Sequence, residues 1–386
     1  MALTILQNPA TASLAQSPII FSLSSSTDVT QSGFQYVGDL YYWSGTEADS
    51  GSSKYTLVKY PNSSAVGIFD FSKILNSTLT DFAIANKSNV KYFKGSFSTQ
   101  WLSGSTYSTG STVTTSSVYK ALDGYSLFQE PIGQEINLKT PHWPIMSDGP
   151  VSQSALLQNG GSGSVYTGVA GGTQPTKIIY SGSTGNGSFA VSTTTSTSGQ
   201  IAQFPMFPSS PSFPISTTNL DWYTIQAASN STKLGTPIYF SVDCIQKYPN
   251  VRIQFKNRYG QFDFINLYGA SQNSFSTDRK SYQPQIGTWE SSTLSYQSYD
   301  SQNQPYVVNA KQSLVANTQW LPEGENDIIK ELLSSDEIYW IYNESTGAVR
   351  PLAITSSNIS FKTGVVDKVI QYAFTFDWAQ NYKLII

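Results

Sequence analysis

Hydrophobic and polar residues alternate with a period of two over several short stretches in the first hundred residues. In residues 34–42, for example, Phe34, Tyr36 and Leu40 fall on alternate positions. This spacing places apolar side chains on one face of an extended strand. Strands are predicted on this basis over residues 19–23, 34–42, 55–60, 66–71 and 90–101. A short helix is predicted over residues 72–82 with Ser72 as its N-cap, so residues 1–100 are expected to form a β-sandwich domain.

The middle of the chain, residues 101–235, has a different composition. Residues 102–118 and 160–199 are mostly Ser, Thr and Gly, which is typical of surface loops and hairpin tips. Residues 176–180 interrupt the second tract and predict an ordered hairpin within it. The Pro-rich residues 204–214 are expected to form an extended, packed connector, because proline is excluded from central strands.

Residues 236–386 are predicted to form a C-terminal β domain with one amphipathic helix at about 325–333. Val251, Ile253 and Phe255 share one face of a hairpin, and Phe262 and Phe264 are expected to continue that face after the turn at 257–260. Further strands are predicted over residues 239–244, 337–342, 349–354 and 370–378. The expected fold is therefore mainly β, with two or three β-sandwich or β-barrel-like domains, long Ser/Gly-rich loops and one or two short helices.

The chain is poor in charge. Only 12% of its 386 residues are Asp, Glu, Lys or Arg, against about 25% in ordinary soluble proteins. Acid–base, nucleophilic and metal chemistry all need titratable side chains, so this composition favours a building block over an enzyme. The formal charge of −3 gives no basic surface for nucleic acid. We therefore predict no enzymatic activity and no nucleic-acid binding.

The expected location also follows from the sequence. No apolar run approaches the roughly 18 residues of a membrane span, so no membrane insertion is predicted. The N-terminus lacks the basic and apolar regions of a secretory signal, and a single cysteine excludes an internal disulfide. Synthesis in a reducing cytoplasm is expected. The sequons at Asn76, Asn230 and Asn358 are interpreted as by-products of the Ser, Thr and Asn content.

The residues that could carry chemistry are few, and we predict no catalytic residue, no cofactor and no metal site. His142 is the only histidine and lies in a Pro-His-Trp-Pro segment, so it is interpreted as a packed residue. Cys244 follows Asp243 in a predicted strand and is interpreted as a small buried apolar residue. As a nucleophile, Cys244 would need His142 beside it.

Two further groups of residues define alternatives. A carboxylate pair in a groove would suit a glycosidase, and the candidate acids are Asp221, Asp243, Asp263 and Glu290. Exposed tyrosines in polar surroundings would suit a protein or glycan interface, because tyrosine combines contact area with a hydrogen-bonding hydroxyl. The candidates for that interface are Tyr41, Tyr42, Tyr296 and Tyr299.

Three stretches of the chain resemble the virion proteins of tailed bacteriophages. They are residues 17–23 with 34–37 and 66–70, residues 254–264 with 277–282, and residues 326–335 together with the strands that follow. The pattern is similar to tail-hub, ring and upper-tail subunits of phages that infect Bacteroidetes, including the crAss-like group. It covers the first eighty or so residues and most of the last 150.

This resemblance implies a non-enzymatic subunit of the tail, tail hub or connector region of a virion, made in the host cytoplasm. Its expected partners are copies of itself in a cyclic homo-oligomer and neighbouring virion proteins. Surfaces poor in charge agree with this role, because they are inexpensive to desolvate at an interface. The alternatives are a receptor- or glycan-binding tail fibre or adhesin, with a host-surface glycan as partner, and a jelly-roll capsid protein.

Overall fold

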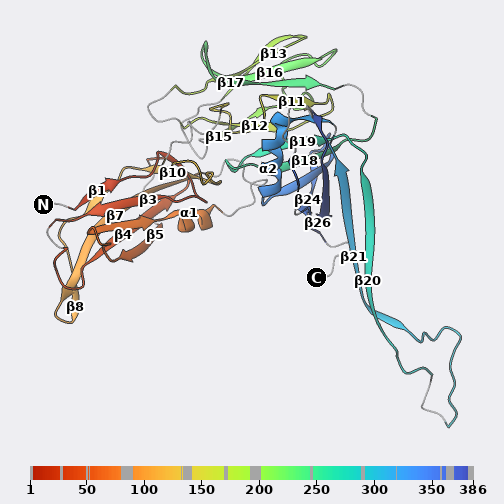
Figure 1. Ribbon diagram of the computed structural model, residues 1–386, viewed down its shortest axis with the longest axis horizontal. Coiled ribbons are helices and arrows are strands. Elements are labelled where there is room, and N and C mark those ends of the chain that lie inside the picture. The colour runs from red at the N-terminus through yellow and green to blue at the C-terminus, as the bar shows by residue number, and fades with distance from the viewer. Residues whose placement is uncertain are drawn as a thin grey trace.

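A computed structural model gives the structure of the chain and confirms a mainly β fold with two α-helices among the described residues. It describes residues 3–26, 29–48, 51, 53–79, 90–131, 133, 141–168, 173–191, 201–243, 247–287, 292–318, 320–356, 359–361 and 369–380. Figure 1 shows an N-terminal unit, a middle unit above a C-terminal sheet, and a long arm that leaves that sheet. No helix in these ranges is long and apolar enough to cross a membrane.

The N-terminal unit is a β-sandwich of two sheets. One sheet has the order β1-β3-β6, and the other has β2-β10-β7-β4-β5 with β8 and β9 paired to β7. Aromatic residues from both sheets, such as Phe21, Phe69, Phe93 and Phe97, are fully buried between them. The strands are β1 Thr4–Gln7, β2 Ala12–Leu14, β3 Ile20–Ser24, β4 Gln35–Trp43, β5 Ser53–Lys59, β6 Val66–Asp70, β7 Val90–Ser103, β8 Thr106–Thr109, β9 Thr114–Thr115 and β10 Tyr119–Leu122.

The predicted helix is present but is capped differently. Helix α1 spans Ser72–Thr78, and Phe71 occupies the N-cap position, so the prediction of Ser72 as N-cap is wrong. The Asp70 carboxylate accepts hydrogen bonds from the backbone N–H groups of Ser72 (2.9 Å) and Ile19 (3.1 Å). An acidic acceptor just before the helix satisfies a free N–H group there and ties the helix to the start of β3.

Pairing between strands places the ends of two predicted domains later than the sequence suggested. The Ser/Thr/Gly-rich tract at 102–118 contains β8 and β9, and β10 also pairs with β7, so the first unit continues to Leu122 rather than residue 100. Residue 235 falls inside β17, which ends at Val242.

The middle unit consists of a five-stranded sheet, β11-β17-β16-β13-β14, that packs on the two-stranded sheet β12-β15. The predicted hairpin in the second Ser/Gly tract is β13–β14. The Pro-rich connector begins as β15 and then buries Met206 and Phe207 in the same core. The strands are β11 Ser152–Ala155, β12 Ser162–Tyr166, β13 Lys177–Gly182, β14 Gly185–Ala190, β15 Ile201–Pro205, β16 Trp222–Ser229 and β17 Thr232–Val242.

The C-terminal unit is a seven-stranded sheet in the order β19-β18-β23-β24-β26-β21-β20. Helix α2, Asn326–Ser334, follows a short 3₁₀ turn at Glu323–Glu325 and covers one face of this sheet with Ile328, Ile329 and Leu332. The strands are β18 Val251–Lys256, β19 Phe262–Leu267, β20 Gln272–Tyr282, β21 Gln304–Asn317, β23 Ile338–Asn343, β24 Ala348–Ile354 and β26 Ala373–Trp378; β22 Leu321–Pro322 and β25 Val369–Ile370 form a separate pair.

The hairpin β18–β19 is buried on both faces, which corrects the prediction of one shared apolar face. Phe255 pairs with Asp263 and Gln254 pairs with Phe264, so Phe262 and Phe264 lie on the face opposite Phe255. Directly opposed residues of an antiparallel pair share a face. Phe264 therefore packs into the core of the middle unit, whereas Phe255 packs towards α2.

The predicted strand at 370–378 is divided into two. Ile370 ends β25, and the next regular strand, β26, begins at Ala373. Between them, the backbone N–H of Tyr372 donates to the Thr318 hydroxyl (2.8 Å), and the Thr318 N–H donates to the Tyr372 carbonyl oxygen (2.8 Å). These two hydrogen bonds turn the chain away from β22 and lead it into the seven-stranded sheet.

Candidate functional site

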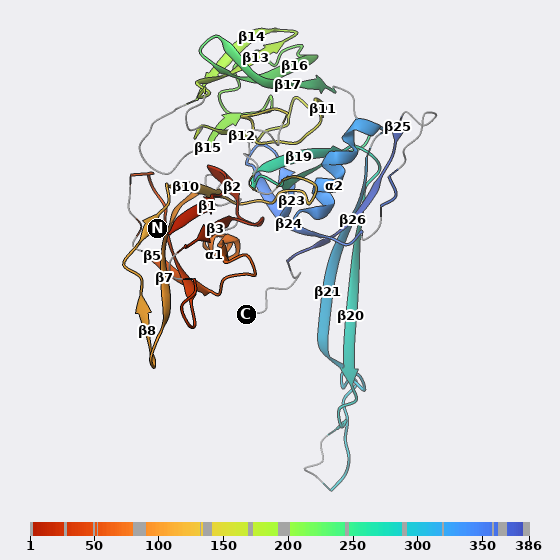
Figure 2. The same cartoon turned by 60° about the vertical axis from the view of Figure 1, so that its left-hand side comes forward.

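The most distinctive surface of the molecule is a two-stranded arm formed by β20 and β21. Its strands are paired without interruption from Gln272↔Val315 to Tyr282↔Gln304, except for one bulge near Tyr306. Only Ser313–Asn317 of β21 also pairs with β26, so the remainder of the hairpin extends beyond the sheet. About eight residue pairs at about 3.4 Å each give a free length of roughly 27 Å before the tip. Figures 1 and 2 both show the arm pointing away from the other units.

The edge strand of the arm, β20, is exposed along its whole length. All eleven residues of β20 are exposed, and β20 pairs with no described strand other than β21. Large apolar side chains are among them: Phe275 is 52% exposed and Tyr306 is 62% exposed. Most apolar residues of this size are buried in folded proteins, so a group of them on one projection marks an interaction surface.

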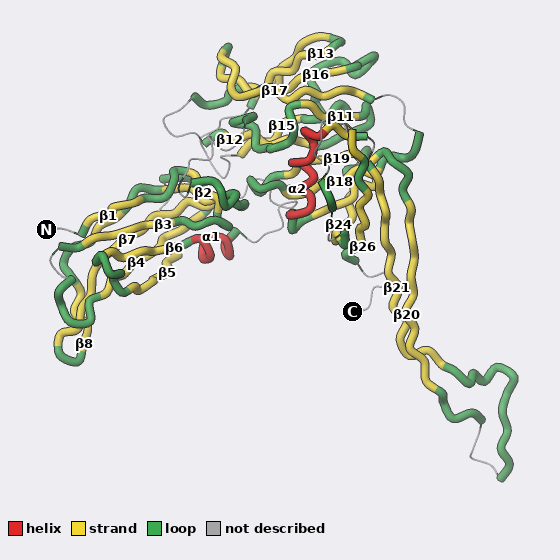
Figure 3. Tube along the Cα trace, in the orientation of Figure 1, coloured by secondary structure: helices red, strands yellow, loops and turns green. Residues whose placement is uncertain are grey.

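At the tip of the arm, residues 283–287 and 292–303 are drawn as loop in Figure 3. The Asp300 carboxylate accepts a hydrogen bond from the Gln297 N–H (2.8 Å), and the Tyr282 hydroxyl donates to Gln304 (2.9 Å). These contacts surround an open hollow of about 480 Å³ lined by Pro284, Gln285, Ile286, Gly287, Ser295, Gln297, Tyr299, Asp300, Ser301 and Gln304.

The four tyrosines predicted as interface candidates fall in two separate places. Tyr296 and Tyr299 lie at the tip of the arm and are 74% and 81% exposed. Tyr41 and Tyr42 are half-buried in β4 of the N-terminal sandwich. The Tyr41 ring lies 5.9 Å from the Lys54 ammonium and 5.8 Å from the Lys94 ammonium, so its surroundings are already filled by this unit. Of these four tyrosines, Tyr296 and Tyr299 are therefore the two whose rings are largely exposed.

His142 is fully buried between the N-terminal part of the middle unit and β17. Its Nδ1 lies 2.9 Å from the Thr236 carbonyl oxygen and its Nε2 lies 3.0 Å from the Gly149 carbonyl oxygen. Each ring nitrogen of His142 contacts a backbone oxygen, so the imidazole links the backbone at Gly149 to the backbone at Thr236. This agrees with the interpretation of His142 as a packed residue. Cys244 lies outside the described residues.

Of the candidate acids, Asp221 and Asp243 are neighbours, whereas Asp263 lies apart from them on β19. Asp221 and Asp243 are exposed at neighbouring ends of β16 and β17, where the Val242 N–H donates to the Asp221 carbonyl oxygen. Asp263 is buried instead, and its carboxylate accepts a hydrogen bond from the Asn257 amide (3.0 Å). Burial raises the pKa of Asp263 above its usual range. Glu290 lies outside the described residues.

A junction of buried charges, which sequence reasoning missed, surrounds the turn between β18 and β19. The Arg258 guanidinium contacts Glu130 (2.6 Å), Asp148 and Glu331 (3.8 Å). Burial acts to lower the pKa of Arg258, but its interactions with neighbouring groups, chiefly the Asp148 carboxylate, raise it overall. Burial raises the pKa of Glu331. This turn therefore joins all three units through one cation, since Glu130 follows the N-terminal sandwich and Glu331 lies on α2.

The neighbouring Lys256 makes a second part of the same junction. Its ammonium lies 2.8 Å from Asp123, 3.3 Å from Asp336 and 3.8 Å from Glu337. A cleft of about 580 Å³ opens beside Arg258, lined by Tyr125, Leu127, Pro141, Asp148, Arg258, Asp327, Lys330, Glu331 and Ser334. Because Asp148 and Glu331 both contact the Arg258 guanidinium, they belong to a buried polar network that joins the units.

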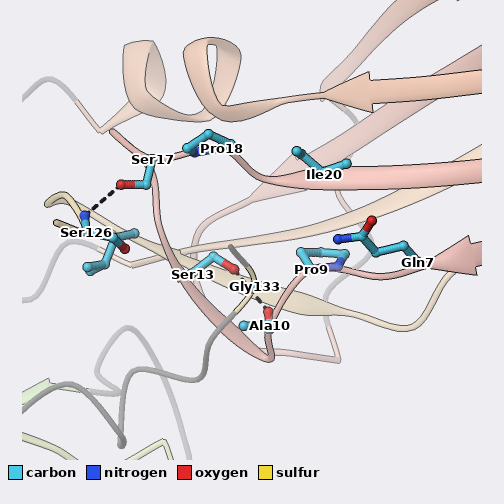
Figure 4. A pocket seen from close by; sticks show the side chains of 10 residues that line it. Gln7, Pro9, Ala10, Ser13, Ser17, Pro18, Ile20, Ser126 and Gly133 are labelled. Carbon is cyan, nitrogen blue, oxygen red and sulfur yellow. Dashed lines mark hydrogen bonds between the residues drawn. The ribbon is translucent and has the colours of Figure 1, made fainter. Parts of the chain in front are cut away.

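A third hollow lies at the base of the N-terminal sandwich (Figure 4). It has a volume of only about 20 Å³, enough for roughly one water molecule. Its lining contains Gln7, Pro9, Ala10, Ser13, Leu14, Ser17, Pro18, Ile20, Ser126 and Gly133, none of them titratable. Among the described residues, no group of three or more His, Cys, Asp or Glu side chains is arranged to hold a metal ion.

Comparison with known proteins assigns no family, because no family model and no curated protein matches this chain. One solved structure, from work on host cell surface retention of a 1.5-MDa bacterial ice-binding adhesin, is 9% identical and covers 69% of this chain and 83% of that chain, with a TM-score of 0.21. A mutant of Salmonella alpha-2-macroglobulin is also 9% identical, covers 98% of this chain and 30% of that chain, and has a TM-score of 0.18. Likenesses this distant carry no argument about fold or function.

Proposed function

We propose that this protein is a non-enzymatic structural subunit of a tailed-phage virion, and that it assembles with copies of itself into a symmetric ring in the tail, tail hub or connector region. The observation that supports this most directly is the exposed arm β20–β21. An isolated two-stranded hairpin is at best marginally stable in water, and it becomes stable when a further strand or another element packs against it. The arm therefore functions as an element that reaches a neighbouring subunit.

The body of the molecule suits this role as well. Its three units are joined by the buried charges of Lys256 and Arg258, so the base from which the arm projects is held in place. A heterologous contact, in which the arm of each subunit docks on a different surface of the next, closes into a ring when the rotation between subunits permits it.

The first experiment removes the arm and leaves the sheet intact. Residues 275–312 are replaced by Asn-Gly, which joins the opposed residues Ser274 and Ser313 through a two-residue hairpin turn. The full chain is expected to sediment as an oligomer in analytical ultracentrifugation, and the excised chain as a monomer with an unchanged circular dichroism spectrum. A full chain that remains monomeric up to its solubility limit contradicts assembly.

The virion location needs its own test. A reconstruction of an intact tailed phage that encodes this chain is expected to contain a ring of density that accommodates the body and its arm. A ring assembled in vitro with no counterpart in the particle would leave assembly intact and contradict the location.

A receptor- or glycan-binding adhesin is the second candidate, and one observation favours it. Tyr296 and Tyr299 are exposed beside the hollow at the arm tip, where a sugar ring would meet both aromatic and amide groups. Binding of the full chain to a glycan array, lost in Tyr299→Ala and retained in Tyr306→Ala, would support this function. Tyr306 is the matched control, because it is also an exposed tyrosine of the arm but does not line the hollow.

A further inference from the structure

The five-stranded sheet of the middle unit has two different faces. On one face, Tyr223 of β16 and Phe240 of β17 are fully buried in the core, where their rings stack with centroids 4.8 Å apart. Successive side chains of a strand point to opposite faces, so Trp222 and Tyr239 belong to the other face, here called the outer face. Figures 1 and 2 show this sheet at an end of the molecule, with β12 and β15 on its core side. The outer face is therefore on the side away from that core.

Two aromatic rings lie together on the outer face. Tyr239 pairs with Thr224 and Trp222 pairs with Ser241, so the two aromatic residues are diagonal neighbours. Their ring centroids are 6.0 Å apart with 18° between the planes, and each residue is 36% exposed. Among the described residues, neither the Trp222 indole N–H nor the Tyr239 hydroxyl has a hydrogen-bonding partner. Nearly parallel rings with unused polar tips suit the apolar faces and the hydroxyl groups of a sugar chain.

Uncharged polar groups continue the outer face beside these rings. Strand pairing places Ser181 opposite both Thr224 and Asn186, in one row across three strands. The Thr224 hydroxyl donates to the Ser181 carbonyl oxygen (3.3 Å), and the Ser181 hydroxyl donates to the Asn186 side-chain oxygen (2.6 Å). Two residues along β16, the Gln226 amide donates to the Gly235 carbonyl oxygen (2.7 Å). These contacts orient the side chains and leave the Asn186 amide nitrogen and the Gln226 side-chain oxygen for a ligand.

Two lysines lie at the far end of the outer face. Ala228 follows Thr224 and Gln226 at intervals of two along β16, and it pairs with Lys177 of β13 on one side and Lys233 of β17 on the other. Neighbouring strands are about 4.8 Å apart, so the two lysine Cα atoms are roughly 10 Å apart across this small alanine. Neither ammonium has an ion-pair partner among the described residues. An anionic group between them would be held from both sides.

The charge of this sheet favours an anionic ligand. Its five strands contain no Asp or Glu, and Lys177 and Lys233 are their only charged residues. Asp221 and Asp243 lie just beyond β16 and β17, at the opposite end from the lysines. The chain as a whole has a formal charge of −3, so an excess of two cations distinguishes this face. An anion is attracted to the lysine end and repelled from the other.

We propose that the outer face of this sheet binds an acidic polysaccharide, with a sugar ring against Trp222 and Tyr239 and a carboxylate or sulfate group between Lys177 and Lys233. The rows that contain Tyr239 and the lysines are four residues apart along β16, roughly 14 Å. The ligand is therefore a chain of sugars rather than a single one. This site is separate from the hollow at the arm tip, and the inference goes beyond the proposed assembly without depending on it.

Single-stranded nucleic acid also combines flat rings with anions, but this face suits a polysaccharide better. Nucleic acid carries a phosphate at every nucleotide and is bound in positively charged grooves that follow its backbone. The strands of this sheet supply two cations, and the groups between them and the rings are hydroxyls and amides, which pair with sugar hydroxyls. Nucleic acid is accordingly the competitor in the test.

The first experiment measures binding of the full chain to immobilised polymers by biolayer interferometry. Alginate and chondroitin sulfate are the acidic probes, dextran is the neutral probe, and oligo(dT) is the nucleic acid. The parent is expected to bind at least one acidic probe about tenfold or more tighter than dextran and oligo(dT). Absence of binding to both acidic probes, or comparable or tighter binding of dextran or oligo(dT), overturns the proposal.

The second experiment locates the site with single tryptophan variants. Trp222→Ala is expected to weaken binding of the acidic probe about tenfold or more, as the loss of a central aromatic contact does. Trp320→Ala is the matched control, because Trp320 is a 64% exposed tryptophan next to β22 of the C-terminal unit. Unchanged binding by Trp222→Ala, or an equal loss in both variants, contradicts the assignment of the site.

A pair of lysine variants keeps the proposal testable if Trp222→Ala does not fold. Lys177→Gln combined with Lys233→Gln is expected to weaken binding about tenfold at low salt and to make the remaining affinity less sensitive to salt. Lys59→Gln combined with Lys73→Gln removes the same charge from exposed positions of the N-terminal unit and should bind like the parent. Equal affinities of the two double variants would overturn the anion site.

Sedimentation of the same variants separates this inference from the proposed function. All of them are expected to assemble like the parent, because none lies on the arm. A parent that binds the acidic probe but remains monomeric contradicts the assembly and supports the polysaccharide site. A parent that assembles but binds neither acidic probe gives the opposite result.

Discussion

Arg252 and Glu344 form a 2.9 Å ion pair between β18 and the loop that follows β23. The Arg252 guanidinium carbon lies 4.2 Å from the centre of the Phe207 ring and 4.7 Å from the centre of the Phe264 ring, and these two rings contact each other edge to face. Its Nη1 also donates to the Gly160 carbonyl oxygen, so one side chain of the C-terminal sheet is fixed inside the middle unit. The burial that isolates it lowers the pKa of Arg252.

We predict that Glu344→Gln destabilises the protein more than Arg252→Met does. The first change leaves a buried guanidinium without its counter-charge, a loss of roughly 3–5 kcal/mol. The second removes the buried charge itself, and Glu344 keeps the Gly160 N–H (3.0 Å) as a partner and partial access to water. Chemical denaturation measures both, with the exposed Asp278→Asn as control. Equal losses in the two variants would contradict the predicted role of the buried charge.

We predict that Gly124→Ala loosens the contact between the N-terminal sandwich and the turn of β18–β19. Gly124 has a φ of +130°, and an added Cβ would overlap the Arg258 carbonyl oxygen. The matched control is Gly104→Ala, since Gly104 also has a positive φ of +67° but open space around it. Gly104→Ala is expected to cost about 1–2 kcal/mol through backbone strain alone. Gly124→Ala should cost about 1–3 kcal/mol more through overpacking, measured by thermal unfolding.

Stability is predicted to fall with rising pH because of Glu325, at the N-terminal end of α2. Burial raises the pKa of Glu325 to about 7 in the folded protein, from 4.5 in the absence of such effects. A raised carboxyl pKa means that the folded state binds the proton more tightly. The resulting stabilisation is complete below pH 4.5 and is lost as the pH rises through about 7. Denaturation midpoints at pH 5 and pH 8 should therefore differ less in Glu325→Gln than in the parent. Parallel behaviour, as expected of Asp278→Asn, would show that Glu325 does not contribute.

Hydrogen exchange is predicted to report the state of the arm. In dilute monomer, the β20 amides should exchange rapidly, because β20 is an exposed edge strand that pairs with β21 alone among the described strands. In the assembled protein the same amides should exchange more slowly, while those of β18 remain slow in both. Exchange rates of β20 that do not depend on protein concentration would show that the arm is uncovered in solution.

The sequence predicted the strands whose apolar residues alternate over a polar background. Residues 34–42 and 251–264 are examples, since their period of two is visible against Ser and Asn neighbours. The arm was missed because its alternation runs between Thr, Val and Ala on one face and Ser, Asn and Lys on the other, a contrast too weak to stand out in a chain rich in Ser and Thr. Its candidate tyrosines, Tyr296 and Tyr299, were selected from their polar surroundings alone.

The buried charges could not be predicted from local sequence. Arg252, Gln254 and Lys256 alternate with Val251, Ile253 and Phe255, which is the pattern of a strand with one face in water. The polar face is buried because another unit of the chain covers it, and that contact involves residues such as Asn159 and Glu130 that are about 90 to 130 positions away. The same packing reversed the predicted orientation of Phe264. Long-range contacts of this kind leave no periodic signal.

The β18–β19 hairpin contributes side chains to the core of the middle unit and to the core of the C-terminal sheet, so separating these two units would expose buried residues. A force applied to the end of the arm therefore passes through β21 and its partner β26 to the sheet that contains this hairpin. If the chain is the virion subunit proposed above, a load on one neighbouring subunit would pass to the next through this shared core.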